Sequence, residues 1–195
     1  MSDVQKLYQE IILEHHRTPR HARRVPEATH SAVANNPLCG DRVTVTLRVG
    51  ELGGAPNAAG AALNELGCEV QGCALCRASG SIASELLLGC SVEQAAALVA
   101  WFIALVRAPL GAPGTQQSSE SAGVPEPAAP EPAGCARTVC RPNTEDARRI
   151  APLLEVRQFA SRRRCATLPW EAFGMALRGA GTGTATPPPT APAPK

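Results

Sequence analysis

Three cysteines and one aspartate in this 195-residue chain are of the types that bind transition metals and carry sulfur. Cys39 and Asp41 flank Gly40, whose conformational freedom would let a thiolate and a carboxylate turn toward one ion. Cys73 and Cys165 are each predicted to open a helix, where partly positive backbone amides favour the thiolate. Three thiolates and one carboxylate suit tetrahedral zinc in number and type of ligand. Because the four residues are far apart in sequence, spacing alone does not define the site.

The remaining cysteines are interpreted as structural. Eight cysteines in a cytosolic chain indicate metal binding or sulfur chemistry before they indicate disulfides. Cys76 completes a C-x-x-C and, one helical turn in, could reach the same pocket, but it is interpreted as having no function there. Cys68 and Cys90 are expected in the core or at its boundary, and Cys135 and Cys140 are taken as inert. The alternative for the candidate ligands is a set of buried structural thiols and a turn-forming aspartate.

The elements that must position these residues begin with an amphipathic helix predicted over residues 3–18, which Pro19 ends. His15 and His16 near its end are interpreted as solvated charge at a helix C-terminus rather than as ligands. Apolar and polar residues alternate over 43–49, which predicts a strand with one buried face.

A turn is expected over residues 51–60, and two more short strands over 61–70. A helix is predicted over 74–88. Ser91 then opens another helix, with Gln94 as its capping-box partner. That second helix is apolar over most of its surface, so we expect it to be central to the core.

The composition changes at residue 108. Pro, Gly, Ser, Ala and Glu dominate residues 108–142, which predicts a low-complexity insertion. Residues 1–107 and 143–178 are then expected to form a single domain, and residues 179–195 a disordered tail.

Two further helices are predicted after the insertion. The first begins at Asn143, a suitable N-cap, and should stop or kink near Ala151 because Pro152 follows. The last covers residues 166–177. The elements together predict an α+β domain with a small antiparallel sheet.

Net charge, composition and the length of apolar runs limit the classes of function that the sequence supports. The formal net charge of +2 and aromatic content of 3% give no support for nucleic-acid binding. The longest apolar run, 95–106, is too short for a bilayer, and the polar first residues do not resemble a signal peptide. We therefore expect a cytoplasmic protein that binds neither nucleic acid nor membrane.

Four stretches of the sequence resemble the SufU/IscU/NifU-type iron–sulfur cluster assembly proteins. Together they extend over most of residues 4–178 outside the insertion. They are, in order, LYQEIILEHHR (7–17), NPLCGD (36–41), GCALCRAS (72–79) and VRQFASRRRCATLPW (156–170).

The resemblance implies an α+β fold with a three-stranded antiparallel sheet and a site made of Cys39, Asp41, Cys73 and Cys165. Arg164 stands where the IscU branch has a histidine, so the chain is more similar to the SufU branch. In that branch zinc occupies the pocket, and the protein accepts persulfide sulfur from a cysteine desulfurase for a downstream assembly scaffold. In the IscU branch the same pocket assembles iron into a [2Fe–2S] cluster.

On this reading Cys39, on its glycine turn, is the sulfur-accepting nucleophile. Arg162 and Arg164 would support it, because three thiolates and a carboxylate exceed the charge of one zinc ion, and they could dock an acidic partner. Three functions remain open: zinc-dependent sulfur transfer, a non-enzymatic [2Fe–2S] scaffold, and a protein whose zinc is only structural.

Overall fold

The computed structural model describes residues 3–51, 61–108 and 144–179. The predicted turn, insertion and tail lie outside these residues, apart from their end positions, so the predicted division into one domain, an insertion and a tail stays a prediction. In the part of the chain that is described, no helix combines the length and apolarity needed to cross a membrane.

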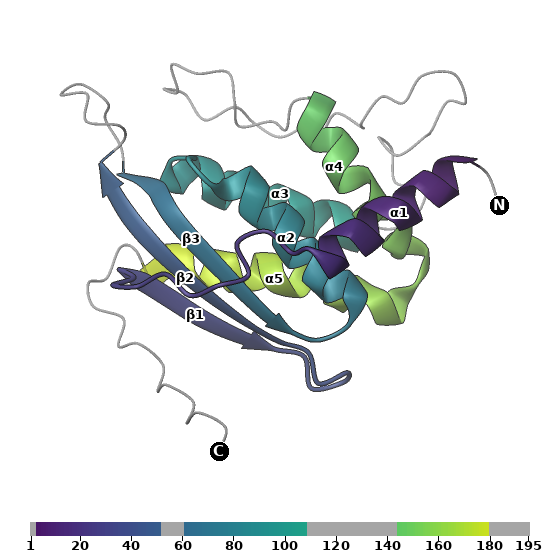
Figure 1. Cartoon of the computed structure of the whole chain (residues 1–195), viewed down its shortest axis with the longest axis horizontal. Helices are drawn as coiled ribbons and strands as arrows, with labels where there is room; N and C mark the ends of the chain where they lie inside the picture. The colour runs from purple at the N-terminus through teal and green to yellow at the C-terminus, as the bar shows by residue number, and fades with distance from the viewer. Residues whose placement is uncertain (1–2, 52–60, 109–143, 180–195) are drawn as a thin grey trace.

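The sheet has three antiparallel strands in the order β1-β2-β3, which confirms the predicted fold class (Figure 1). The strands are β1 (His30–Asn35), β2 (Arg42–Glu51) and β3 (Ala61–Gln71). The pattern did not predict β1. The prediction of two short strands over 61–70 was wrong, because β3 runs unbroken and a register shift opposite Arg48 and Val49 absorbs its irregularity.

Both faces of β2 are covered, whereas the sequence predicted one buried face. Val43, Val45 and Leu47 point into the core, but Thr44 and Thr46 are buried too. The segment between α1 and β1 lies over the face of the sheet that carries Thr44 and Thr46. Two hydrogen bonds hold it there: Val25 N–H to Thr46 Oγ1 (3.0 Å) and Cys68 N–H to the His21 carbonyl (2.9 Å).

The helices follow the predicted order with two changed boundaries. They are α1 (Asp3–Arg17), α2 (Ala74–Leu87), α3 (Val92–Arg107), α4 (Thr144–Leu154), the 3-10 turn η1 (Glu155–Gln158) and α5 (Ala160–Gly179). The predicted capping box of Ser91 and Gln94 is confirmed. Pro152 does not stop α4 near Ala151, because it lies in the last turn and removes only one backbone donor. Helix α5 begins six residues before the predicted Ala166.

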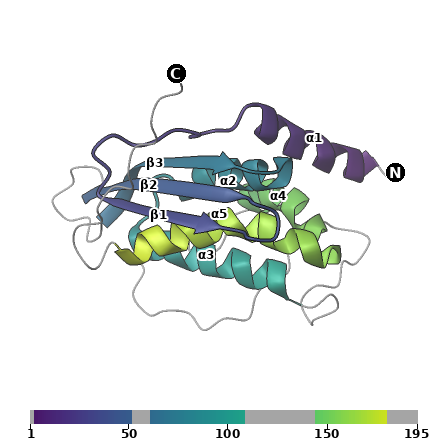
Figure 2. The same ribbon diagram turned by 90° about the horizontal axis from the view of Figure 1, so that it is seen from below.

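Helices α2 and α5 pack on the sheet, and α3 packs on α5 from the side away from the sheet (Figures 1 and 2). The predicted central position of α3 is therefore wrong: only one side of it is buried, through Ala95, Val99, Phe102 and Val106. Helix α5 takes the central place. Its fully buried Trp170 stacks on Phe102 with ring centroids 4.1 Å apart.

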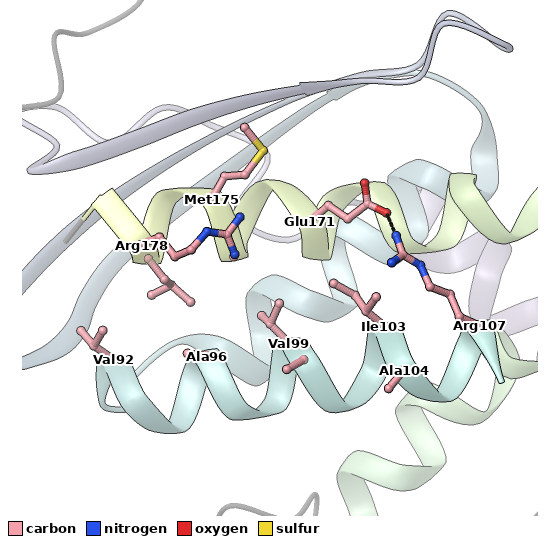
Figure 3. Close-up of a pocket in the computed structure, with 12 residues that line it drawn as sticks. Val92, Ala96, Val99, Ile103, Ala104, Arg107, Glu171, Met175 and Arg178 are labelled. Carbon is pink, nitrogen blue, oxygen red and sulfur yellow. Dashed lines mark hydrogen bonds and ion pairs between the residues drawn. The ribbon is translucent and has the colours of Figure 1, made fainter. Parts of the chain in front are cut away.

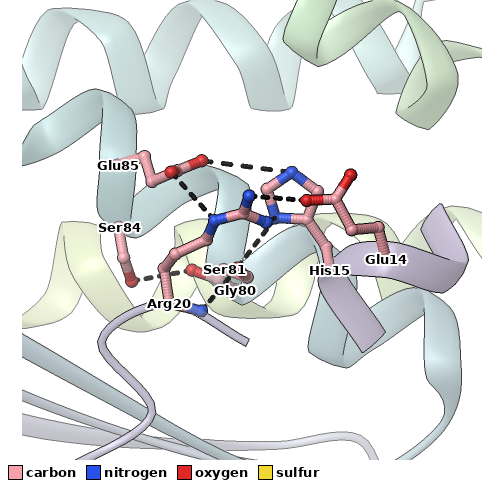
Figure 4. A network of polar contacts seen from close by, with 7 residues as sticks. All are labelled: Glu14, His15, Arg20, Gly80, Ser81, Ser84 and Glu85. Atoms are coloured by element: carbon pink, nitrogen blue, oxygen red, sulfur yellow. Dashed lines mark hydrogen bonds and ion pairs between the residues drawn. The ribbon is translucent and has the colours of Figure 1, made fainter. Parts of the chain in front are cut away.

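A polar cluster joins α1 to α2 (Figure 4). His15 is buried, which corrects the expectation of a solvated histidine. Its Nδ1 lies 2.8 Å from Ser81 Oγ and 3.1 Å from the Arg20 guanidinium, and Arg20 also pairs with Glu85 (3.1 Å). Burial, followed by the Arg20 charge, lowers the pKa of His15. The imidazole is therefore neutral near pH 7 and accepts at Nδ1.

Candidate metal and sulfur site

The loop between β1 and β2 presents the first two candidate ligands. Two backbone hydrogen bonds close it: Asn36 N–H to the Asp41 carbonyl and Gly40 N–H to the Asn36 carbonyl, both 2.8 Å. Gly40 has φ +76, a left-handed conformation that glycine adopts without steric cost. The turn leaves Cys39 exposed and Asp41 buried.

Helix α5 brings Cys165 to this loop. Ligand atoms of Cys39, Asp41 and Cys165 all lie within 4.8 Å of one another. The sulfurs of Cys39 and Cys165 are 3.8 Å apart. Two sulfurs bound tetrahedrally at about 2.3 Å from one zinc ion would also be about 3.8 Å apart. The donor set and this spacing fit the metal that the sequence predicts.

Cys73 joins the group through Asp41. Its sulfur lies 3.5 Å from Asp41 Oδ2, and its backbone N–H donates to Asp41 Oδ1 (3.0 Å). As predicted, Cys73 is placed at the start of α2, where its sulfur accepts from the Cys76 N–H (3.5 Å). The structure thus gathers all four predicted residues from the β1–β2 loop, the start of α2 and α5.

The Asp41 carboxylate is held by donors on several sides. Burial alone would raise its pKa, but the Cys73 N–H and the thiols of Cys39, Cys165 and Cys73 donate to it and together lower that pKa. Gly72 leaves room for the carboxylate, because a Cβ at that position would lie 2.6 Å from Asp41 Oδ1. The carboxylate is therefore ionised and fixed in position.

Cys165 differs from its prediction. It lies in the second turn of α5 rather than at its first residue, so the partly positive helix N-terminus does not explain its chemistry. Burial, and then the neighbouring Cys73, raises the pKa of its thiol. A cation at the site would oppose this effect by stabilising the thiolate.

Asn36 contributes to the site although the sequence analysis gave it no role. It is 2% exposed, and its side-chain amide donates to Cys39 Sγ (2.9 Å) while its Oδ1 accepts from the Leu38 N–H (3.2 Å). Its position as the first residue of the NPLCGD motif was the only feature of the sequence that could have indicated this role. Asn36 fixes the loop and orients the exposed sulfur at once.

The structure places the two predicted supporting arginines, Arg162 and Arg164, in different surroundings. Arg164 is exposed, and its Nη2 reaches the Asn35 carbonyl (3.5 Å) at the end of β1, so it lies over the base of the Cys39 loop. Arg162 is exposed at the start of α5. Arg163 between them instead donates to the Arg157 carbonyl (2.6 Å).

The other described cysteines are not part of the group. Cys76 is fully buried in the core, where burial strongly raises the pKa of its thiol. Burial also raises the pKa of Cys68 to about 12. Cys90 is half-buried and contacts the Leu86 carbonyl (3.3 Å). Cys135 and Cys140 lie outside the described residues.

Comparison with known proteins defines the class. The family model described as "NifU-like N terminal domain" matches residues 7–122. An iron–sulfur cluster assembly scaffold protein IscU from Streptococcus pyogenes serotype M1 is 24% identical over 91% of this chain and 87% of its own length. The zinc-dependent sulfurtransferase SufU of Bacillus subtilis (strain 168) is 27% identical over 48% of this chain and 57% of its own.

Solved structures share the fold. A putative iron–sulfur cluster assembly scaffold protein for the SUF system from Fervidobacterium islandicum AW-1 superposes with a TM-score of 0.59 at 16% identity, covering 89% of this chain and 98% of that one. A NifU-like N-terminal protein from Brucella abortus gives a TM-score of 0.60 at 19% identity, over 91% and 96% of the two chains.

The chain therefore belongs to the NifU-like N-terminal domain family, and its relatives include an IscU scaffold protein of iron–sulfur cluster assembly and a SufU sulfurtransferase. This confirms the resemblance stated from its motifs, and the match to SufU is consistent with the expected branch.

Proposed function

We propose that this protein is a zinc-dependent acceptor of persulfide sulfur from a cysteine desulfurase, which it passes to a downstream iron–sulfur assembly scaffold. The observation that carries the proposal is the unequal exposure of the site's sulfurs. Cys39 is exposed on a turn at one edge of the group, whereas Cys165, 3.8 Å away, is 1% exposed. One sulfur can meet a partner while the others stay in place.

Cys39, Asp41, Cys73 and Cys165 would hold the metal. Bound zinc would keep the thiols deprotonated near neutral pH, against the effect of burial. The exposed Arg162 and Arg164 would offset the surplus negative charge of the ligands and attract the acidic surface of a partner.

Sulfur acceptance is a thiolate exchange. The Cys39 thiolate attacks the outer sulfur of the desulfurase cysteine persulfide, and a new S–S bond forms as the donor S–S bond breaks. The donor cysteine leaves as a thiolate, and Cys39 carries the persulfide. The step needs no external oxidant or reductant. The buried Asn36 amide, 2.9 Å from Cys39 Sγ, orients the attacking sulfur.

A second function, assembly of a [2Fe–2S] cluster on the same residues, has its own support. The relative matched over most of both chains is named an IscU scaffold, while the SufU match spans about half of each. Three thiols and a carboxylate suit iron–sulfur chemistry as well as zinc. Anaerobically purified protein distinguishes the two, because an iron- and sulfide-containing coloured protein would support the scaffold.

The test is a desulfurase assay on metal-quantified protein. Wild-type protein should raise turnover of the desulfurase and acquire a persulfide detectable by mass spectrometry, and Cys39→Ala should lose both effects. Cys90→Ser, a half-buried cysteine outside the site, is the matched control and should behave as wild type. Sulfur acceptance retained by Cys39→Ala would refute the assignment.

A further inference from the structure

A groove of about 680 Å³ runs between α3 and α5, away from the sulfur site (Figure 3). Its walls are apolar and include Val92, Val99 and Ile103 from α3 and Met175 from α5. Helix α3 carries four exposed alanines, of which Ala96, Ala100 and Ala104 line the groove and Ala97 lies outside its lining. Helix α3 is thus apolar both on its packed side and on the side turned to solvent.

The two ends of α3 carry exposed side chains of opposite charge, Glu93 and Arg107. At the C-terminal end of α3, Arg107 pairs with Glu171 of α5 (2.8 Å). At the other end, Glu93 is exposed in the first turn of α3. The Arg178 side chain extends back along α5, and its guanidinium lies beside Gly174, close to the Val99 side chain in the middle of the groove (Figure 3).

An antiparallel copy of α3 matches this arrangement. If Ala100 meets itself on a two-fold axis, Ala96 faces Ala104 of the second copy, and Glu93 faces Arg107 of the second copy. Because the Glu93–Arg107 pair occurs twice, charges of opposite sign meet at both ends of the helix pair. A two-fold interface requires this self-complementarity, since each contact occurs twice. The alanines let the two helix backbones approach closely.

We propose that this protein forms a two-fold homodimer in which α3 of each copy lies antiparallel in the α3–α5 groove of the other. Association covers the apolar side of α3 and the exposed part of Met175. Among the described residues, the groove is lined by none of the four that make up the sulfur site. The dimer therefore leaves Cys39 accessible, and the proposal is independent of the proposed function.

The first test is sedimentation equilibrium of the full-length chain from about 1 μM to about 1 mM, a range that includes weak dimers. Wild type should convert from monomer to dimer. Ala100→Glu places two like charges on the axis and should stay monomeric, with unchanged zinc content and circular dichroism. Ala22→Glu, which alters an exposed alanine outside the groove, is the matched control and should dimerise as wild type does.

A second variant tests the charge pairing with less disturbance of packing. Glu93→Gln removes two symmetric ion pairs and should raise the dimer dissociation constant by about 2- to 30-fold, whereas Glu10→Gln, at an exposed position on α1, should leave it unchanged. A monomeric wild type over the whole range would overturn the proposal and leave the groove to a helix of another protein. Equal dimerisation of wild type and Ala100→Glu would also overturn it.

Discussion

Cys39 and Cys165 are neighbours with opposite surroundings. One lies on an exposed turn with an amide donor, and the other lies inside a helix where burial raises the pKa of its thiol. Between them, Asp41 accepts from both thiols and from the Cys73 N–H. Under the proposed function, this difference in exposure is the reason for placing sulfur exchange at Cys39 and a purely metal-holding role at Cys165.

Gly72 provides a test of the aspartate. Gly72→Ala would put a Cβ 2.6 Å from Asp41 Oδ1, so the carboxylate must move. We expect zinc affinity to fall by about 10- to 100-fold, as for loss of groups that orient metal ligands. Competition with a chromophoric chelator measures the change. Gly179→Ala, where the nearest atom is 4.0 Å away, is the control; equal zinc affinity of both variants would contradict the role of Gly72.

At the residue scale, the sequence predicted the proposed ligands but not their surroundings. NPLCGD and the two later cysteine motifs identified the four residues by resemblance. Nothing in residue types or spacing showed that Asn36 would donate to Cys39, or that His15 would be buried beside Ser81. The His15–Ser81 contact joins residues 66 positions apart and depends on long-range packing, which local pattern does not encode. The Asn36–Cys39 contact lies within one loop, but it depends on the side-chain geometry of that turn, which residue types do not specify.

At the scale of elements, the docking of α1 on α2 depends on the protonation state of His15. The pKa of His15 is lowered in the folded protein, so the unfolded chain takes up its proton first as pH falls below about 6.5. The contribution of neutral His15 to the free energy of unfolding is complete above that pH and is lost progressively below it. His15→Gln cannot titrate, so its unfolding free energy should fall less between pH 7.5 and 5.5 than that of wild type.

Urea titrations of both proteins at several pH values measure this difference. Both proteins carry the same carboxylates. The difference between their slopes of unfolding free energy against pH therefore reports the titration of His15 alone. Identical pH profiles for wild type and His15→Gln would show that the cluster in Figure 4 does not couple α1 docking to pH.

Elements with a clear apolar period were predicted well, and the others were not. β2, α1, α2 and the capped start of α3 follow their patterns. β1 has only six residues, and the first turns of α5 are rich in arginine, so neither shows a period. The apolar outer side of α3 predicted a central helix because sequence alone does not separate a core face from an exposed alanine face.

At the scale of the whole molecule, metal binding and stability should be linked. A metal that binds only the folded protein stabilises it by about 2.7 kcal/mol when its free concentration is 100 times the dissociation constant. Chelation should therefore lower the midpoint of thermal unfolding of zinc-loaded wild type. Asp41→Ala, which lacks one proposed ligand, should show a smaller decrease. Equal midpoints with and without chelator in wild type would contradict metal binding at this site.

The overall architecture was predictable mainly through the resemblance. Composition and periodicity indicated an α+β domain, whereas the expectation of three antiparallel strands in one sheet came from the family resemblance. The cover over the second face of the sheet was not predicted, because the segment between α1 and β1 has no helical or strand period. Its backbone hydrogen bonds and its ion pairs, Arg23–Glu65 and Arg24–Glu69, form only once β2 and β3 are in place.

The proposed ligands come from three separated parts of the chain, and the last of them lies in α5. During translation, Cys39, Asp41 and Cys73 therefore emerge from the ribosome well before Cys165, the fourth proposed ligand, has been synthesised. A growing polypeptide can offer only a partial chelate during most of its synthesis. Stable loading with an ion would then wait until α5 has emerged and docked, so metal content would report only on chains in which α5 is in place.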